Sequence, residues 1–223
     1  MTVIPGSDII NSTLYVVSQS LLLPVIAVLL IMLVYVVIEG GGIISEYSIR
    51  RKTTFVEVES FIMNISNNSS PATIKDILEE IELPKVHKEI LGKIADISAL
   101  GVKSREVLAR KLIEEEEIKA IKKIEKTDII AKIAPAIGLM GTLIPMGPGL
   151  AALGAGDITT LSQNLMVAFD AAILGMASAA IAFTISRVRR RWYEDQISNL
   201  DAMAESLLEV IQNAKEKKKT YIE

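Results

Sequence analysis

The sequence contains no cysteine and a single histidine, His87. These absences exclude a disulfide framework, a thiolate nucleophile and a Cys-rich zinc site, and they leave no second imidazole for a His-based metal site. No nucleophile–base pair and no converging set of metal ligands is visible elsewhere, and the acidic run at 114–117 is typical of a solvated helix face. We therefore expect that the protein is not an enzyme and that it binds no cofactor and no metal ion. We also expect His87 to be exposed.

Basic residues are absent from two long stretches, residues 1–49 and 133–186, so that all 24 Lys and Arg lie elsewhere. A net charge of −3 offers no basic face for phosphate contacts, which excludes nucleic acid as an expected partner. Half of the residues are hydrophobic and the mean hydropathy is +0.40, more apolar than an ordinary soluble domain. The composition predicts an integral membrane protein.

Three apolar segments are long enough to cross a bilayer, at residues 14–38, 133–155 and 165–186. The first would span about 37 Å as a helix, more than the hydrocarbon core requires. Since no basic residue precedes it, we expect it to be retained rather than cleaved as a signal peptide. The predicted fold is all-α, an integral membrane protein with three transmembrane helices and long helices that extend into the cytoplasm.

The basic clusters determine the expected orientation. They follow the first span at Arg50–Lys52, precede the second at Lys122–Lys132 and follow the third at Arg187–Arg191. By the positive-inside rule all three are cytoplasmic. We expect an extracytoplasmic N-terminus over 1–13, a cytoplasmic helical insert over 39–132, an outer turn over 156–164 and a cytoplasmic C-terminal helix over 187–223, in a multi-pass protein of the cell (inner, cytoplasmic) membrane.

Turn signals at Leu83–Pro84 and Ala99–Gly101 divide the cytoplasmic insert into short helices. Residues 103–128 form its clearest helix, which can run directly into the second span. Apolar residues at helical spacing in the tail after Arg191 predict a helix that packs on this insert.

Small residues recur at helical spacing in the second and third spans. They are Ala134, Gly138, Gly141, Ala171, Gly175 and Ala179. Such faces let membrane helices approach closely, and taken alone they indicate packing rather than a function.

Pro145 and Pro148 each remove a helical hydrogen bond from the second span. We expect a kink or a break there, near a cavity or the outer boundary, because a freed carbonyl is tolerated at membrane depth only where protein or water satisfies it. The alternative is a helix that ends early.

Asp170 and Thr142 are the candidate residues of an ion pathway. A carboxylate near the centre of a membrane helix costs about 2.5 to 3.5 kcal/mol and normally faces a bundle interior. Asp170 is close enough to the outer end of its span to lie among headgroups or in a structural pair instead. The Thr142 hydroxyl can exchange proton-linked hydrogen bonds in the same interior, or simply bond back to its own helix.

The segment IAPAIGLMGTL at 133–143 and the segment AFDAAILGMASAAIAF at 168–183, together with the order of spans, resemble the MotA/TolQ/ExbB proton-channel family, ExbB and TolQ in particular. The resemblance implies a homo-oligomer, a pentamer, that surrounds single-span helices of an ExbD/TolR-like partner carrying a membrane Asp. It also implies that Thr142 matches the second-span pore threonine. Ala172 stands where the family has a third-span threonine, Val167 where some members have an acidic residue, and Pro145 where the family has glycine.

Two functions follow from these residues. The first is a subunit of a membrane complex that is driven by protons or another cation and transduces that energy, for example to protein transport. The second is a non-conducting structural scaffold of the same fold, which the alanine at 172 favours. A partner carboxylate is expected on chemical grounds for the first, because this chain has few ionisable groups inside its spans.

Overall fold

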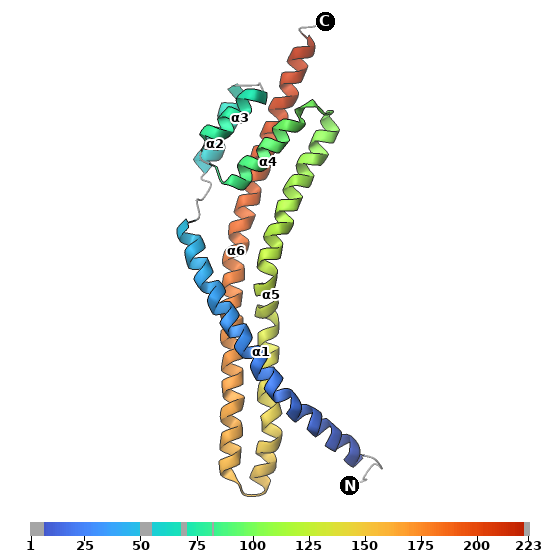
Figure 1. Cartoon of the computed structure of the whole chain (residues 1–223), viewed down its shortest axis with the longest axis vertical. Helices are drawn as coiled ribbons and strands as arrows, with labels where there is room; N and C mark the ends of the chain where they lie inside the picture. The colour runs from blue at the N-terminus through green and yellow to red at the C-terminus, as the bar shows by residue number, and fades with distance from the viewer. Residues whose placement is uncertain (1–6, 50–54, 68–70, 82, 221–223) are drawn as a thin grey trace. The chain divides into compact units, whose positions relative to one another are not determined.

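The computed structural model describes residues 7–49, 55–67, 71–81 and 83–220, and every element among them is helical. The helices are α1 (Ser7–Ile49), α2 (Phe55–Asn67), α3 (Pro71–Glu80), α4 (Lys85–Asp96), a short 3-10 helix η1 (Ile97–Ala99), α5 (Val102–Gly154) and α6 (Ile158–Thr220). The predicted all-α fold is confirmed (Figure 1).

Among the described residues, three helices are long and apolar enough to cross a membrane, namely α1, α5 and α6. The described chain divides into two units. The membrane unit consists of α1 up to Ser48 and residues 124–188 of α5 and α6. The helical unit consists of α2, α3, α4, η1 and the remaining parts of α5 and α6.

The turn between α5 and α6 is shorter than the sequence suggests. It comprises only Ala155–Asp157, so residues 158–164 belong to α6 rather than to an outer turn. Gly156 has a φ of 79°, a left-handed conformation that glycine adopts without steric cost. Asp157 caps α6, because its carboxylate accepts hydrogen bonds from the Thr160 N–H (3.0 Å) and hydroxyl (2.5 Å). The α5–α6 hairpin is therefore closed by local interactions.

The expected helix break at Pro145 and Pro148 is not present, since α5 continues to Gly154. Proline at 148 has no N–H to donate to the carbonyl of Ile144, four residues earlier. Gln19 on α1 supplies the missing donor, its Nε2 lying 3.1 Å from the Ile144 oxygen. A neighbouring helix thus satisfies the freed carbonyl. Prolines within membrane helices are tolerated where such a donor is available.

In the membrane unit, α1 packs on α5 and α6 through a small apolar cluster. Its buried members are Val25, Leu29, Ile144 and Ala171, with Leu22, Ile137 and Leu174 packed beside them. Most of the other large apolar side chains of α1 are exposed, among them Leu23, Ile31 and Ile38. A helix that is apolar on all sides is suited to lipid.

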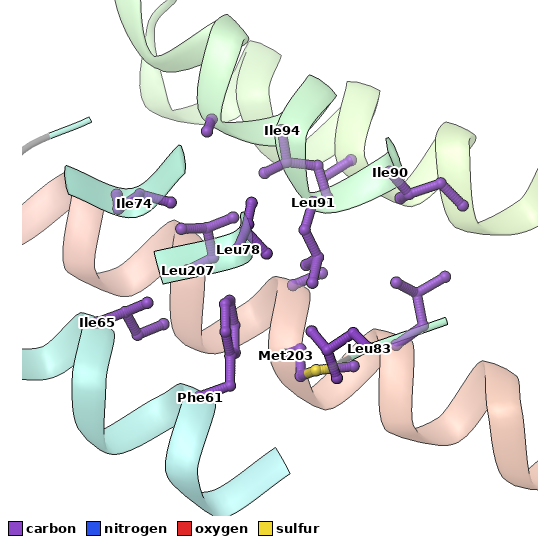
Figure 2. Packing of buried hydrophobic residues seen from close by; sticks show 14 of the residues in the cluster. Phe61, Ile65, Ile74, Leu78, Leu83, Ile90, Leu91, Ile94, Met203 and Leu207 are labelled. Atoms are coloured by element: carbon purple, nitrogen blue, oxygen red, sulfur yellow. The ribbon is translucent and has the colours of Figure 1, made fainter. Parts of the chain in front are cut away.

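The helical unit has a hydrophobic core of its own, built from α2, α3, α4, α5 and α6. Figure 2 shows Phe61 and Ile65 of α2 facing Leu207 of α6, with Leu78 of α3 and Leu91 of α4 closing the cluster. Residues 102–123 of α5 continue into the second span, and the tail after Arg191 packs on the insert, as the sequence predicts.

The expectation that His87 is exposed is wrong, because its side chain is 3% exposed within α4. Desolvation lowers the pKa of His87 to about 4, although nearby Glu116 and a hydrogen bond with the backbone of Gln196 raise it in part. Its Nδ1 has no hydrogen-bond partner among the described residues. The imidazole is therefore neutral in the folded protein at pH 7.

This burial predicts acid sensitivity of the helical unit. A His87 pKa below its unfolded value means that folding is fully supported above about pH 6.5 and loses up to about 3 kcal/mol as the pH falls toward 4. His87→Leu should remove this contribution. Hydrogen–deuterium exchange of α4 at pH 7 and pH 5, corrected for intrinsic rates, should show a smaller loss of protection in the variant; an equal loss would contradict the assignment.

Candidate functional site

Helices α5 and α6 touch through their small residues, as the sequence predicts. A Cβ added to Gly175 would lie 2.8 Å from both the Ala134 carbonyl oxygen and the Gly138 Cα. One added to Gly141 would lie 2.6 Å from the Ala171 Cβ. These distances are shorter than any side chain allows, so the backbones are in direct contact. Ala179 belongs to the same buried face of α6.

Far from its turn, this hairpin is joined by polar groups that the sequence did not single out. The Ser186 hydroxyl on α6 donates a hydrogen bond of 2.5 Å to the Asp128 carboxylate on α5. Lys132 lies 3.5 Å from the other oxygen of the same carboxylate. Ser178 is fully buried, and its Oγ has no partner among the described residues. These side chains add polar groups to a contact that is otherwise made of alanine and glycine.

Thr142 lies partly buried on α5, and its hydroxyl donates to the Leu139 carbonyl oxygen at 2.7 Å. This is the back-bonded state, which leaves the oxygen lone pairs free to accept. At 100° per residue, Thr142 is about 150° around α5 from Ile137 and Ile144, the residues packed against α1. Thr142 therefore lies on the side of α5 that is remote from α1.

Asp170 is exposed on α6 and has no hydrogen bond or ion pair with any residue that the structure describes. Leu174, one turn further along α6, packs in the cluster with α1. Because residues one turn apart share a helix face, Asp170 is on the α1 side of α6. A single chain thus does not bring Thr142 and Asp170 together, which the sequence alone could not show.

The surface around Asp170 is otherwise apolar. Met166, Phe169, Ile173 and Met176 are each more than half exposed. A carboxylate cannot face lipid at low cost, so a second chain or water must cover Asp170 in the membrane.

Many large apolar side chains of the spans are exposed, and among the described residues no group of three or more His, Asp or Glu could hold a metal ion. The described membrane helices carry hydroxyl and carboxylate groups but no set of metal ligands. Hydroxyl and carboxylate groups can relay protons or replace the hydration water of a cation.

A model of the MotA/TolQ/ExbB proton channel family matches residues 101–202, which include the α5–α6 hairpin, Thr142 and Asp170. A comparison with curated proteins found no match. The family match confirms the resemblance seen in the sequence, and with the three apolar helices it makes the chain a multi-pass membrane protein.

Substitution at Gly175 tests the close contact of α5 and α6. Gly175→Ala forces the two backbones apart and should lower the free energy of unfolding by about 1 to 3 kcal/mol. Gly147→Ala is the matched control, because nothing lies within 4 Å of its added Cβ. Thermal unfolding in detergent measures both. A Gly175→Ala protein as stable as the control would contradict the contact.

Proposed function

We propose that the chain, whose residues 101–202 match the model of the MotA/TolQ/ExbB proton channel family, is a non-enzymatic, ExbB/TolQ-like subunit of an energy-transducing complex driven by protons or another cation. Several copies, five by the family pattern, form a ring around single-span ExbD/TolR-like partner helices in the cytoplasmic membrane. The N-terminus lies outside and the helical unit inside, as the basic clusters require.

The position of Thr142 carries this proposal. It is a membrane hydroxyl on the side of α5 remote from α1, whereas α1 presents its bulky residues to the surroundings. If α1 faces lipid, the Thr142 side of the hairpin faces the interior of a ring. There the hydroxyl oxygen can accept a hydrogen bond from water or from a partner's carboxylic acid, while the Thr142 O–H continues to donate to the Leu139 carbonyl oxygen.

A membrane potential supplies about 2.3 kcal/mol for each elementary charge per 100 mV, which is the driving force for such a ring. The chain itself has one carboxylate within its spans, Asp170, and that group lies away from Thr142. A partner helix that brings a carboxylate into the interior supplies the proton carrier that the Thr142 side lacks.

Asp170 has a separate place in the proposal. On the α1 side of α6, it meets a neighbouring copy or water at the outer end of the span, where a carboxylate raises the local concentration of cations entering the complex. This role compensates in part for the absence of a hydroxyl at Ala172. The alternative is the non-conducting scaffold, in which Asp170 pairs with the neighbour and no ion flows.

Thr142→Val tests the interior route, because valine keeps the shape and removes the hydroxyl. In proteoliposomes containing the complex purified with its natural partner, proton uptake under an imposed potential should fall about tenfold, the equivalent of one hydrogen bond. Thr142→Ser should restore it. Thr184→Val is the matched control, since Thr184 also bonds back to its own helix, at Ala180. Unchanged uptake in Thr142→Val would contradict the route.

Asp170→Asn separates the conducting reading from the scaffold. The substitution preserves size and hydrogen bonding but removes the charge, so we expect proton uptake to fall while the number of copies in the complex, measured by native mass spectrometry, stays the same. Normal uptake with a complex that dissociates would assign Asp170 to a structural contact between copies.

A further inference from the structure

A groove of about 420 Å³ lies between α5 and α6 within the helical unit. Its walls come from one stretch of α5 and one of α6: Glu106, Ala109, Arg110, Ile113, Asp201, Ala204, Glu205, Leu208, Glu209 and Gln212. All of these residues belong to the same unit.

The rim of the groove is strongly acidic. Asp201, Glu205 and Glu209 recur every four residues on one face of α6, and Glu106 faces them from α5. Arg110 is the one basic residue in the lining. No three carboxylates within the described residues are close enough to hold a metal ion. A row of separated carboxylates about 12 Å long fits an extended polycation rather than a single ion.

The floor of the groove is apolar and is formed by small side chains. Ala109 and Ala204 are buried and have the smallest side chains that a helix face offers, while Ile113 and Leu208 border them. Small residues in a groove allow the backbone of a docked helix to come close, and the carboxylates on the rim can pair with basic residues on that helix.

We propose that this groove binds a Lys- and Arg-rich amphipathic segment on the cytoplasmic side of the single-span partner. The inference rests on the proposed function, which supplies both the partner and the cytoplasmic location of the helical unit. The charge of the occupant follows from the positive-inside rule, because the cytoplasmic flank of a single-span protein carries an excess of Lys and Arg. Basic side chains one turn apart on that segment match the spacing of Asp201, Glu205 and Glu209.

The test uses the full chain in phosphatidylcholine nanodiscs and a fluorescein-labelled helical peptide of Lys, Leu and Ala, with Lys recurring one turn apart. A peptide with Glu in place of each Lys and nanodiscs without protein are the blanks. Glu205→Lys combined with Glu209→Lys reverses the charge at two positions on the rim of the groove. Glu194→Lys combined with Asp195→Lys makes the same charge change at exposed positions on α6 outside the groove.

Fluorescence anisotropy should show binding of the Lys peptide to the unsubstituted chain, weakened at least about tenfold by the groove pair and less than about twofold by the control pair. Salt should weaken binding further. An equal loss in both pairs, or no binding to the unsubstituted chain, overturns the proposal. So does light scattering in which only the groove pair disrupts self-association, because the occupant would then be a second copy. The assay needs no ion flux, so its failure leaves the Thr142 result untouched, and the reverse also holds.

Discussion

The backbone contact between α5 and α6 is the constraint on which the rest of the membrane unit depends. With Gly138 opposite Gly175 and Gly141 opposite Ala171, no side chain larger than the methyl group of Ala171 separates the two helices at these positions. In lipid there is no hydrophobic force to bring helices together, so van der Waals contact between backbones must do it. That contact also determines which residues face away from it. Thr142 and Asp170 lie on the faces of α5 and α6 that this contact leaves uncovered.

Helix α1 completes this arrangement with one polar bond and one apolar cluster. Gln19 satisfies the Ile144 carbonyl that Pro148 leaves free, and Val25 and Leu29 cover the junction of α5 and α6. Pro148 thus leaves a carbonyl oxygen, that of Ile144, to accept a hydrogen bond from a neighbouring helix, and it does not break α5. Because α1 occupies one side of the hairpin, the opposite side is available for the interior of an assembly, which is the basis of the role proposed for Thr142.

Much of the fold could be predicted from sequence, because apolar length, turn residues and charge segregation are local signals. The spans, the turns before α4 and α5, and the passage of α5 into the membrane all follow from such signals. The continuity of α5 through Pro148 could not be predicted. The donor that satisfies the freed Ile144 carbonyl is Gln19, which is 125 residues away from Ile144 in the chain. The burial of His87 does not follow from its neighbours in the sequence, since Lys85 and Lys88 flank it, whereas α4 buries His87 together with Ile90 and Leu91.

The sequence names Thr142 and Asp170 as candidate residues, but it does not give their geometry. The spacing of Ala134, Gly138 and Gly175 was enough to predict close packing. The positions of Thr142 and Asp170 in the sequence could not show that α1 lies on the same side as Asp170 and away from Thr142. That arrangement depends on the tertiary contacts of α1 with Leu174 and Ile144. Asp128 and Ser186 were missed since they pair across two helices from ordinary polar positions.

The most direct measurement is an electron cryo-microscopy structure of the complex purified in lipid. We predict several copies around a central space, with Thr142 on the wall of that space, a foreign helix inside it and α1 on the lipid side. A complex in which Thr142 faces lipid, or in which α1 fills the centre, would contradict the proposed role of Thr142 and leave the family relationship as shared fold alone.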